Sequence, residues 1–348
     1  MNKTDQTAAA AGSGAPATVD PAVVLQVGAL RKSFSVEDSF WHRLKRLISR
    51  EPPRHLTALD VPGFSVARGE TLGILGESGS GKSTLARVLM GIYDADAGSA
   101  TINGRNIIGV SSSERLKALR DMQMIFQDPF GSLDPRMTVR QIISEPLKIH
   151  GMRPAGDTDQ LLIQALKEVG LEAEALERYP SEFSGGQRQR IGICRALILS
   201  PSLIIADEAV SALDVSVQAQ ILELLMNLRV RRRLSMIFIS HDVAVVRQIS
   251  DRIILLYRGN LVEELPADKL IEGASHPYTR RLLDSALFLR EGNGLGAHQK
   301  AAVNDHGSDN AGGCCYLGVC PLGDARCDEK PPMMNTDAGH RVACWHHR

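Results

Sequence analysis

The sequence has no net charge and no long apolar run, and only one of its six cysteines lies before residue 314. Lysine and arginine together number 40, as do aspartate and glutamate, so no overall field draws the chain toward nucleic acid or an acidic partner. Because no run of about 18 apolar residues is present, we expect no membrane-spanning helix. A length of 348 residues is enough for two or three domains.

The first 22 residues also lack something, namely the leucine- or isoleucine-rich centre of a signal peptide. Alanine, glycine and serine dominate them, which is typical of a disordered tail. Without an export signal we expect a cytosolic, reducing setting. In that setting a cluster of cysteines is more often a metal site than a set of disulfides.

Two segments after this tail are rich in valine and partly alternating, which predicts strands over 23–34 (VVLQVGALRKSF) and 57–66 (TALDVPGFSV). Between them an apolar stripe recurs at helical spacing among basic residues, at Phe40, Leu44, Leu47 and Ile48. This 36–55 insertion either faces a membrane or a partner, or packs on its own domain. We favour the second interpretation.

From residue 71 onward, short and continuously apolar runs alternate with longer helical ones. TLGILG, SLIIAD and MIFIS are typical of strands buried on both faces of a parallel sheet. TLARVLMGIY and VQAQILELLMNLRVRR are helical stretches between them. This order predicts an α/β domain with right-handed crossovers.

Two further stretches depart from that pattern. Residues near 128–183 are richer in proline and charge and contain the helical LLIQALKEVGL, so we expect a helical insertion between strands. Residues 292–313 are rich in glycine, asparagine and alanine, which predicts a linker that separates a cysteine-rich tail from the core.

GESGSGKST follows an apolar strand and opens a helix, the setting that a phosphate-binding loop requires. Its glycines let backbone N–H groups turn toward phosphate oxygens, and the helix N-terminus adds partial positive charge. Lys82 is expected to contact the β- and γ-phosphates, and the Ser83 hydroxyl to bind Mg²⁺. The candidate nucleotide-binding residues are Gly76, Ser78, Gly79, Ser80, Gly81, Lys82, Ser83 and Thr84.

SLIIADE places an acidic pair at the end of a buried strand. Asp207 can hold Mg²⁺ through water. Glu208 can orient or deprotonate a water molecule that attacks the γ-phosphate. Alone such a pair is usually a helix cap, but downstream of a phosphate-binding loop it indicates nucleotide hydrolysis.

FSGGQRQR, beginning at Phe183, lies just ahead of SLIIADE and precedes an apolar helical stretch. Here the sequence resembles the ATP-binding-cassette (ABC) ATPase family, whose signature loop reads LSGGQ. The resemblance covers about residues 24–268. It includes Gln127 in MIFQDP as the Q-loop glutamine and Mg²⁺ ligand, residues 211–214 as the D-loop, and His241 in FISHD as the switch histidine.

The resemblance implies that Lys82, Glu208 and His241 act in ATP hydrolysis and that Phe34 is the candidate for stacking on adenine. It also implies a dimer, because the chain has one phosphate-binding loop and one signature loop. The signature residues would cap ATP held by the second subunit, with donors at a helix N-terminus that suit a terminal phosphate. They are Ser184, Gly185, Gly186 and Gln187.

The fold class implied is α/β, a P-loop NTPase of the ABC type with a RecA-like core, an antiparallel β subdomain and a helical subdomain. We assign the tail to residues 1–22, the ATPase domain to 23–268 with its helical subdomain at about 128–190, and a small cysteine-rich extension to 269–348. The family often has Pro-Thr after the glutamate, whereas this chain has Ala209-Val210, and Phe183 replaces the usual leucine. Neither position supplies a catalytic side chain, so we expect altered loop packing and retained activity.

Four segments narrow the class further: FQDPFGSLDPRMTV, EPL at 145–147, ALDVSVQAQIL and HPYTRRLL. Together they resemble the subfamily that energises bacterial uptake of oligopeptides, dipeptides and nickel, in which HPYT introduces the C-terminal extension. A simpler interpretation treats them as packing segments shared by many cassettes. The combination favours the peptide-type subfamily.

Five of the six cysteines lie in the last 35 residues. In the peptide-type subfamily the extension resembles GC-x₅-C-P-x₅-C…GHRVAC, and this resemblance implies a [4Fe-4S] cluster held by Cys314, Cys320, Cys327 and Cys344. A structural zinc usually takes two closely spaced pairs, which this tail lacks, but zinc and unliganded thiols stay as alternatives. Cys315 adds a thiol that would compete for the first ligand position, and Cys194 is expected to be a buried small side chain.

These features predict an ATPase that uses ATP and Mg²⁺ and lies peripherally on the cytoplasmic face of the inner membrane. The expected partners are a second, related ABC ATPase subunit, two membrane-spanning permease subunits and an extracytoplasmic solute-binding protein, with no nucleic acid. One alternative is a soluble ABC ATPase in a macromolecular complex, although neither a second cassette nor a long coiled coil is visible. Another is an inactive scaffold, against which Glu208 and His241 argue.

Overall fold

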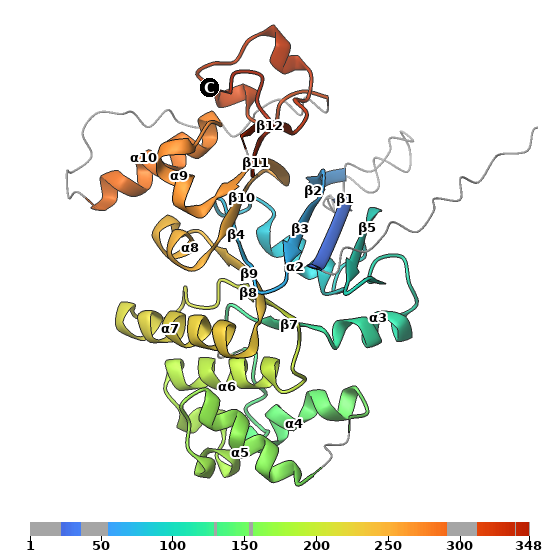
Figure 1. Cartoon of the computed structure of the whole chain (residues 1–348), viewed down its shortest axis with the longest axis vertical. Coiled ribbons are helices and arrows are strands. Elements are labelled where there is room, and N and C mark those ends of the chain that lie inside the picture. The colour runs from blue at the N-terminus through green and yellow to red at the C-terminus, as the bar shows by residue number, and fades with distance from the viewer. Residues whose placement is uncertain are drawn as a thin grey trace, which may run out of the picture.

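The computed structural model describes residues 22–35, 55–128, 131–152, 156–290, 312–337 and 339–347. The predictions for residues 1–21, for the 36–54 part of the insertion and for most of the 292–313 linker fall outside these ranges. The described part is elongated, with an α/β centre, a helical part at one end and the C-terminal segment at the other (Figure 1).

One sheet of 13 strands joins the described residues. Its main path runs β6-β5-β1-β2-β11-β10-β4-β9-β8-β7, with β3, β12 and β13 paired beside that path. The strands are β1 (Val23–Ser35), β2 (His55–Val61), β3 (Phe64–Ala67), β4 (Thr71–Leu75), β5 (Ala97–Ile102), β6 (Arg105–Asn106), β7 (Met122–Ile125), β8 (Leu203–Asp207), β9 (Ser235–Ser240), β10 (Arg252–Tyr257), β11 (Asn260–Pro266), β12 (Met334–Asp337) and β13 (His340–Val342).

The strands β7, β8, β9, β4 and β10 are adjacent and parallel, which confirms the predicted parallel sheet. Their continuous apolar sequence follows from burial on both faces. Along β8, Ile204 and Ala206 belong to one hydrophobic core, and Leu203 and Ile205 to the other. Alternate side chains of a strand point to opposite faces, so both sets must be apolar.

Helices cover the two faces of this sheet. The residues of α2 and α3 share one core with the antiparallel strands, whereas those of α6, α7, α8 and α10 share the other. The helices are α2 (Lys82–Leu89), α3 (Ser112–Leu119), α4 (Val139–Ile149), α5 (Thr158–Glu168), α6 (Gly185–Leu197), α7 (Val215–Arg232), α8 (Val243–Ile249), α9 (Leu270–Gly273) and α10 (Pro277–Arg290). The helix predicted from TLARVLMGIY extended too far, because Gly91 adopts a φ of 69° and ends it.

The two valine-rich segments form antiparallel β structure, as the sequence predicts. β1 pairs with β2, β3 and β5, in each case antiparallel. This layer lies beside α2 and shares its core with the inner side chains of the parallel strands. Phe34 lies near the end of β1, in this layer.

The predicted helical insertion is also present, formed by α4, α5 and α6 at the end of the molecule opposite the C-terminal segment (Figure 1). The helix α6 runs to Leu197, past the boundary near 190 that the sequence suggested. The N-termini of α4 and α6 are each closed by a capping box, at Thr138 with Gln141 and at Ser184 with Gln187. These reciprocal bonds determine where each helix begins.

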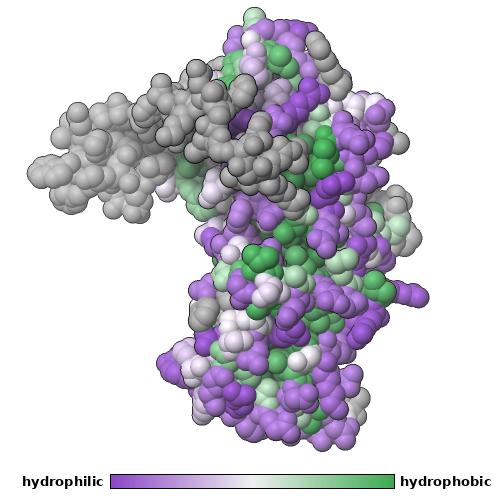
Figure 2. Space-filling model, turned by 90° about the vertical axis from the view of Figure 1, so that its left-hand side faces the viewer, coloured by the Kyte–Doolittle hydropathy of each residue, from purple (hydrophilic) through white to green (hydrophobic). Residues whose placement is uncertain are grey.

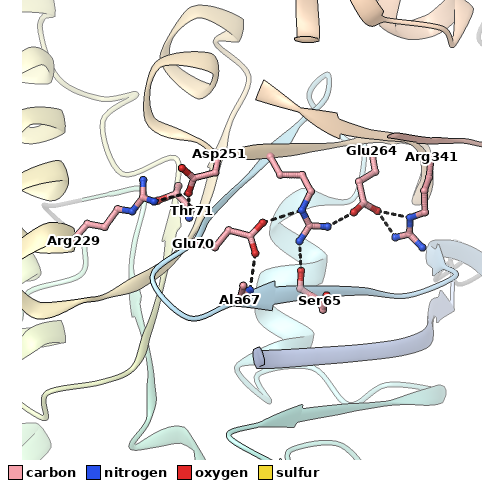
Figure 3. A network of polar contacts seen from close by, with 9 residues as sticks. Ser65, Ala67, Glu70, Thr71, Arg229, Asp251, Glu264 and Arg341 are labelled. Carbon is pink, nitrogen blue, oxygen red and sulfur yellow. Dashed lines mark hydrogen bonds and ion pairs between the residues drawn. The ribbon is translucent and has the colours of Figure 1, made fainter. Parts of the chain in front are cut away.

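The cysteine-rich extension is packed on the core, and the linker predicted before it lies mostly outside the described residues. Strand β13 pairs with β11, and Tyr316, 1% exposed, belongs to the main core. Arg341 Nε of β13 donates to Glu264 Oε2 of β11 at 2.9 Å (Figure 3). A segment this short cannot build a core of its own, so its apolar side chains are buried against the cassette.

The surface is mixed in polarity. On the face seen in Figure 2, hydrophobic residues form separate patches among hydrophilic ones. Of the helices that the structure describes, none is both long and apolar enough to cross a bilayer.

Candidate nucleotide-binding and hydrolysis site

The phosphate-binding loop runs from the end of β4 to the start of α2, as predicted. Gly81 has a φ of 103° at the N-cap of α2, a conformation that other residues rarely adopt. At Gly76 a Cβ atom would lie 2.4 Å from the carbonyl oxygen of Leu256 and 2.6 Å from Ser80 Oγ. The loop is therefore packed directly on the end of β10, and glycine is the residue that fits there.

Lys82 is 4% exposed and its ammonium group lies inside the loop. Nζ donates to the carbonyl oxygens of Gly76 and Glu77, both at 2.8 Å, and lies 3.4 Å from Ser80 Oγ. Burial lowers the pKa of Lys82, and the nearby carboxylates of Glu208, Asp207 and Glu77 oppose this shift. Of the other loop residues, Ser78 and Gly79 are exposed and Thr84 is half-buried on α2.

Ser83 and Asp207 are in contact although they come from different elements. Ser83 Oγ donates to Asp207 Oδ1 at 3.1 Å, and Asp207 is 3% exposed. Burial raises the pKa of Asp207, while the bond from Ser83 and the charges of Arg87 and Lys82 act in the opposite direction. Two hard oxygen ligands side by side are what Mg²⁺ requires from a protein.

Glu208 follows directly after β8 in a left-handed conformation, with a φ of 47°. Its backbone N–H donates to Ile239 O at 3.0 Å, so the turn is held by the adjacent strand β9. Its carboxylate accepts a bond from Gln127 Nε2 at 2.7 Å and lies 3.5 Å from His241 Nδ1. A strained non-glycine residue at such a position is typical of a functional site.

The convergence of these residues follows from the sheet. Gln127, Glu208 and His241 come just after the adjacent parallel strands β7, β8 and β9, so all three lie at one carboxyl edge. Ligands of open α/β sheets bind at that edge. The structure thus brings together six of the predicted residues through the contacts given above: Lys82, Ser83, Gln127, Asp207, Glu208 and His241.

The signature residues lie elsewhere. Ser184 caps α6, and α6 lies in the helical part, away from α2 (Figure 1). Ser184 and Gln187 bond to each other, with Ser184 N donating to Gln187 Oε1 at 3.0 Å. Gly186 is in close contact with α7, because a Cβ there would lie 2.5 Å from Val217 Cγ1. Within the described ranges no hydrogen bond connects these residues or Gly185 to the phosphate-binding loop.

Phe34 is half-buried on β1 and packs edge-on against Tyr93, with 5.2 Å between ring centroids. Lys32 Nζ lies 5.2 Å from the centre of the same ring. The ring is thus supported on one side by an aromatic neighbour. This is compatible with the predicted stacking on adenine, which stays a prediction.

The fold, the loop and the acidic pair together define a P-loop ATPase, and comparison with known proteins places it more closely. A sequence profile described as ABC transporter matches residues 59–211, and one described as oligopeptide/dipeptide transporter, C-terminal region, matches residues 262–327. A probable peptide ABC transporter ATP-binding protein of Sinorhizobium fredii is 43% identical over 327 residues, 92% of this chain and 89% of that protein. The oligopeptide transport ATP-binding protein OppF of Salmonella typhimurium is 40% identical over 330 residues, 92% and 96% of the two chains. The chain belongs to the ATP-binding subunits of oligopeptide/dipeptide-type ABC transporters, and it is an ATPase.

Solved structures agree on the fold. A dimeric ATP-binding cassette, MJ0796, in a post-hydrolysis state with ADP and Pi, is 26% identical and superposes with a TM-score of 0.59, over 70% of this chain and 98% of that one. The cassette cbiO1 from Clostridium perfringens is 22% identical, with the same TM-score, over 77% and 95% of the two chains. The second comparison bears on the fold alone.

The four tail cysteines predicted as ligands lie near one another. Burial raises the pKa of Cys344, and the nearby thiolates of Cys314, Cys320 and Cys327 raise it further. Within the described residues no three of these sulfurs lie within 4.8 Å of one another. Around a tetrahedral zinc with bonds of about 2.3 Å, they would be about 3.8 Å apart. The described sulfurs therefore do not form a preformed zinc site, and the iron-sulfur cluster stays a prediction.

Cys314 is activated by its neighbours. The Cys315 thiol donates to it, and this bond together with one from His276 lowers the pKa of Cys314 to about 4 despite burial. His276 Nδ1 accepts a bond from Tyr278 N at 3.1 Å, so Nε2 is the nitrogen that donates to the sulfur. The buried Cys315 thiol, with its pKa raised, acts as a donor to the first predicted ligand.

A second group of possible ligand atoms lies close by, formed by Asp324, Cys327 and His346. The guanidinium of Arg326 contacts both Asp324, at 3.1 Å from Oδ2, and His346, at 3.3 Å from Nδ1. The Arg326 guanidinium therefore already supplies positive charge to this group, and we interpret the group as an ion-pair cluster instead of a metal site. Cys194 is fully buried, as predicted, and burial raises its pKa to about 12.

Sequence reasoning missed two residues of the site. Tyr278 and Arg281 both contact Glu77 of the phosphate-binding loop. They lie in HPYTRRLL, which the sequence singled out only as a mark of the subfamily. No local pattern could have connected them to a loop some 200 residues earlier.

Proposed function

We propose that the chain binds Mg-ATP at the carboxyl edge of its parallel sheet and hydrolyses it by in-line attack of water. The observation that carries this is the convergence of Lys82, Ser83, Asp207, Glu208, Gln127 and His241 on the phosphate-binding loop. Ser83, Gln127 and Asp207 would hold Mg²⁺, the last through water. Lys82 would exchange its carbonyl partners for the β- and γ-phosphate oxygens.

Four of these groups would act on the transferred phosphate. Glu208 would accept the proton of the attacking water as a general base. His241, beside it, would hold the γ-phosphate by a hydrogen bond. Lys82 and Mg²⁺ would stabilise the negative charge that develops on the phosphoryl oxygens.

The complete site would need two chains. The capping box takes up the N–H groups of Ser184 and Gln187, which leaves the N–H groups of Gly185 and Gly186 at the start of α6 for a phosphate from outside. The similar cassette MJ0796 was solved as a dimer with ADP and Pi, which supports the same arrangement here. The second subunit would be a related cassette or a second copy, and Phe34 would stack on the adenine.

We further propose that this ATPase energises import of peptides or related small solutes. Its partners would be two permease subunits in the inner membrane and an extracytoplasmic solute-binding protein, with the cassettes peripheral on the cytoplasmic face. Phe126, 40% exposed, precedes Gln127 and offers an apolar contact for a permease beside the Mg²⁺ ligand. A displacement of Phe126 would be transmitted to Glu208 through the hydrogen bond from Gln127.

The test is co-purification and reconstitution. The chain, expressed with the peptide-permease subunits of its own organism, should be recovered from solubilised membranes with the permease, and ATP hydrolysis in vesicles should rise with the binding protein and a peptide present. Phe126→Asp should abolish recovery with the permease, whereas the exposed Tyr179→Asp should not. Robust ATPase activity without any permease association would favour a soluble, non-transport ATPase.

For the tail, we propose a [4Fe-4S] cluster bound by Cys314, Cys320, Cys327 and Cys344. The spacing of the four cysteines supports it, as does the backbone hydrogen bond from Cys314 N to Cys327 O at 2.8 Å, which brings two of the proposed ligands together. The cluster would cross-link and so stabilise a segment that lacks a hydrophobic core of its own. Anaerobic purification should give about four irons and four sulfides per chain, and Cys320→Ser should lose them. Zinc in place of iron, or neither element, would refute the cluster.

A further inference from the structure

Two side chains of the C-terminal extension contact the phosphate-binding loop itself. The hydroxyl oxygen of Tyr278 accepts a hydrogen bond from the backbone N–H of Glu77 at 3.0 Å, across 201 positions of sequence. Arg281 Nη2 pairs with Glu77 Oε1 at 3.0 Å. Both residues lie in the first turns of α10. The start of the extension is therefore part of the surroundings of the nucleotide site.

Glu77 is held at three points. The Tyr278 hydroxyl accepts a hydrogen bond from the N–H of Glu77, Arg281 pairs with the Glu77 carboxylate, and Lys82 Nζ donates to the Glu77 carbonyl oxygen at 2.8 Å. Lys82 has to leave that carbonyl in order to reach a phosphate. The bonds from α10 can persist during this exchange, so they can keep the beginning of the loop in place.

Tyr278 is itself rigidly supported. It is fully buried, and its ring packs against Tyr257 and Tyr316, with centroid distances of 4.7 and 5.8 Å. We call these three residues the tyrosine cluster. Tyr257 belongs to β10 and Tyr316 to the cysteine-rich extension, so the cluster joins the two. Burial raises the pKa of Tyr278 above its ordinary value.

We propose that Tyr278, aided by Arg281, is a positioning residue that presets the phosphate-binding loop for nucleotide. A loop whose backbone is already ordered loses less conformational entropy when it closes around phosphates. The Tyr278 bond fixes the peptide N–H of Glu77, the residue after Gly76. Gly76 itself packs too closely against the end of β10 to change its position. This inference rests on the proposed nucleotide site and adds that the extension tunes it.

The proposal predicts a specific kinetic pattern. Phosphate-binding loops contact the phosphates of ADP and ATP alike, so their ordering contributes equally to ground and transition states. Loss of such uniform binding raises KM and leaves kcat unchanged. Tyr278→Phe keeps the ring and removes only the acceptor. We expect the Kd for Mg-ADP and Mg-ATP to rise in parallel by about 2- to 10-fold, the effect of one hydrogen bond.

The experiment measures nucleotide binding by the full-length chain and ATP hydrolysis at saturating ATP. Tyr316→Phe is the matched control, because it loses a hydroxyl from the same cluster that makes no hydrogen bond to the loop in the described part of the chain. The control should bind within twofold of the wild type. Lys82→Ala tests the nucleotide site independently and should lose binding.

The outcomes separate the two proposals. Wild-type affinity in Tyr278→Phe, with binding lost in Lys82→Ala, would overturn the positioning role alone. Full binding by Lys82→Ala would overturn the nucleotide site and the inference with it. Arg281→Gln provides a second variant on a side chain that is 39% exposed. It should raise Kd by about twofold at low salt and less at high salt, because salt screens exposed pairs. No change at low salt would remove Arg281 from the proposal.

Discussion

Gln127 Nε2 donates a hydrogen bond to Glu208 Oε2 across 2.7 Å and so joins the residues that follow β7 and β8. The side chain proposed to bind Mg²⁺ therefore also orients the carboxylate proposed to activate water. Because Phe126 beside it is exposed, a contact made there by another subunit can displace Gln127 and free Glu208. This pair connects the candidate docking surface at Phe126 with the candidate base.

Glu208→Gln should keep ATP binding and arrest turnover. The amide preserves the shape of the side chain but cannot accept a proton at neutral pH, so kcat should fall by about 10²- to 10⁴-fold, the usual contribution of a general base. ATP affinity and ATPase rate are measured separately. Glu223→Gln, an exposed position on α7, is the control and should be unchanged. Undiminished steady-state hydrolysis by Glu208→Gln would refute its role.

Gly76→Ala should weaken nucleotide binding while the rest of the fold persists. The added methyl group would lie 2.4 Å from a backbone oxygen of β10, which cannot move easily, so the loop must shift. We expect ATP affinity to fall more than about 10-fold, as judged by titration calorimetry. Gly192→Ala is the matched control, because a Cβ there meets nothing within 4 Å and α6 should gain up to about 1 kcal/mol. Equal affinity in both variants would contradict the packing argument.

Glu263→Ala should destabilise the chain and loosen its C-terminal extension. Glu263 is fully buried and accepts hydrogen bonds from Ser275 N at 2.7 Å and His276 N at 3.2 Å, and its carboxylate lies 2.9 Å from His340 Nε2. Leaving these buried groups unpaired should cost about 3–5 kcal/mol of the free energy of unfolding. Urea denaturation measures the loss, and limited proteolysis reports whether the extension is released.

The control for this change is Glu272→Ala, an exposed acidic residue on the neighbouring helix α9. It should change the free energy of unfolding by less than about 0.5 kcal/mol. A similar small effect in Glu263→Ala would show that the buried carboxylate does not hold the extension.

Cys194 should resist alkylation in the folded chain. Its pKa is raised to about 12 by burial, so at pH 8 only about one thiol in ten thousand is ionised, and only the thiolate reacts. Raising the pH above 8 should increase the labelling rate about tenfold per pH unit, because the thiolate fraction rises in that proportion below the pKa. Peptide mapping by mass spectrometry after iodoacetamide treatment measures this, with the urea-unfolded chain as control. Rapid labelling of the native chain at pH 8 would contradict the buried position.

The nucleotide site was largely predictable because its residues occur in short local patterns. A phosphate-binding loop needs glycines at set positions between a strand and a helix, and Asp207 and Glu208 follow an apolar strand, so both are visible in a window of ten residues. Their assembly was also predictable, because parallel strands end at a common edge. The position of the extension could not be predicted, because a glycine-rich linker shows how long and how flexible the connection is but not where the segment after it packs.

The sequence by itself determined the parallel strands and the residues offered to phosphate and Mg²⁺, because hydrophobic period and loop composition act over a few neighbouring residues. The class of ATPase followed from the resemblance of its short motifs to the ABC family. Only the tertiary structure decided that the extension lies on the core and that Tyr278 reaches Glu77. It also decided that the Glu263 carboxylate accepts hydrogen bonds from backbone N–H groups and contacts His340 as well. These contacts join residues from 12 to 201 positions apart. They depend on how whole elements pack against each other, which no local pattern of residues encodes.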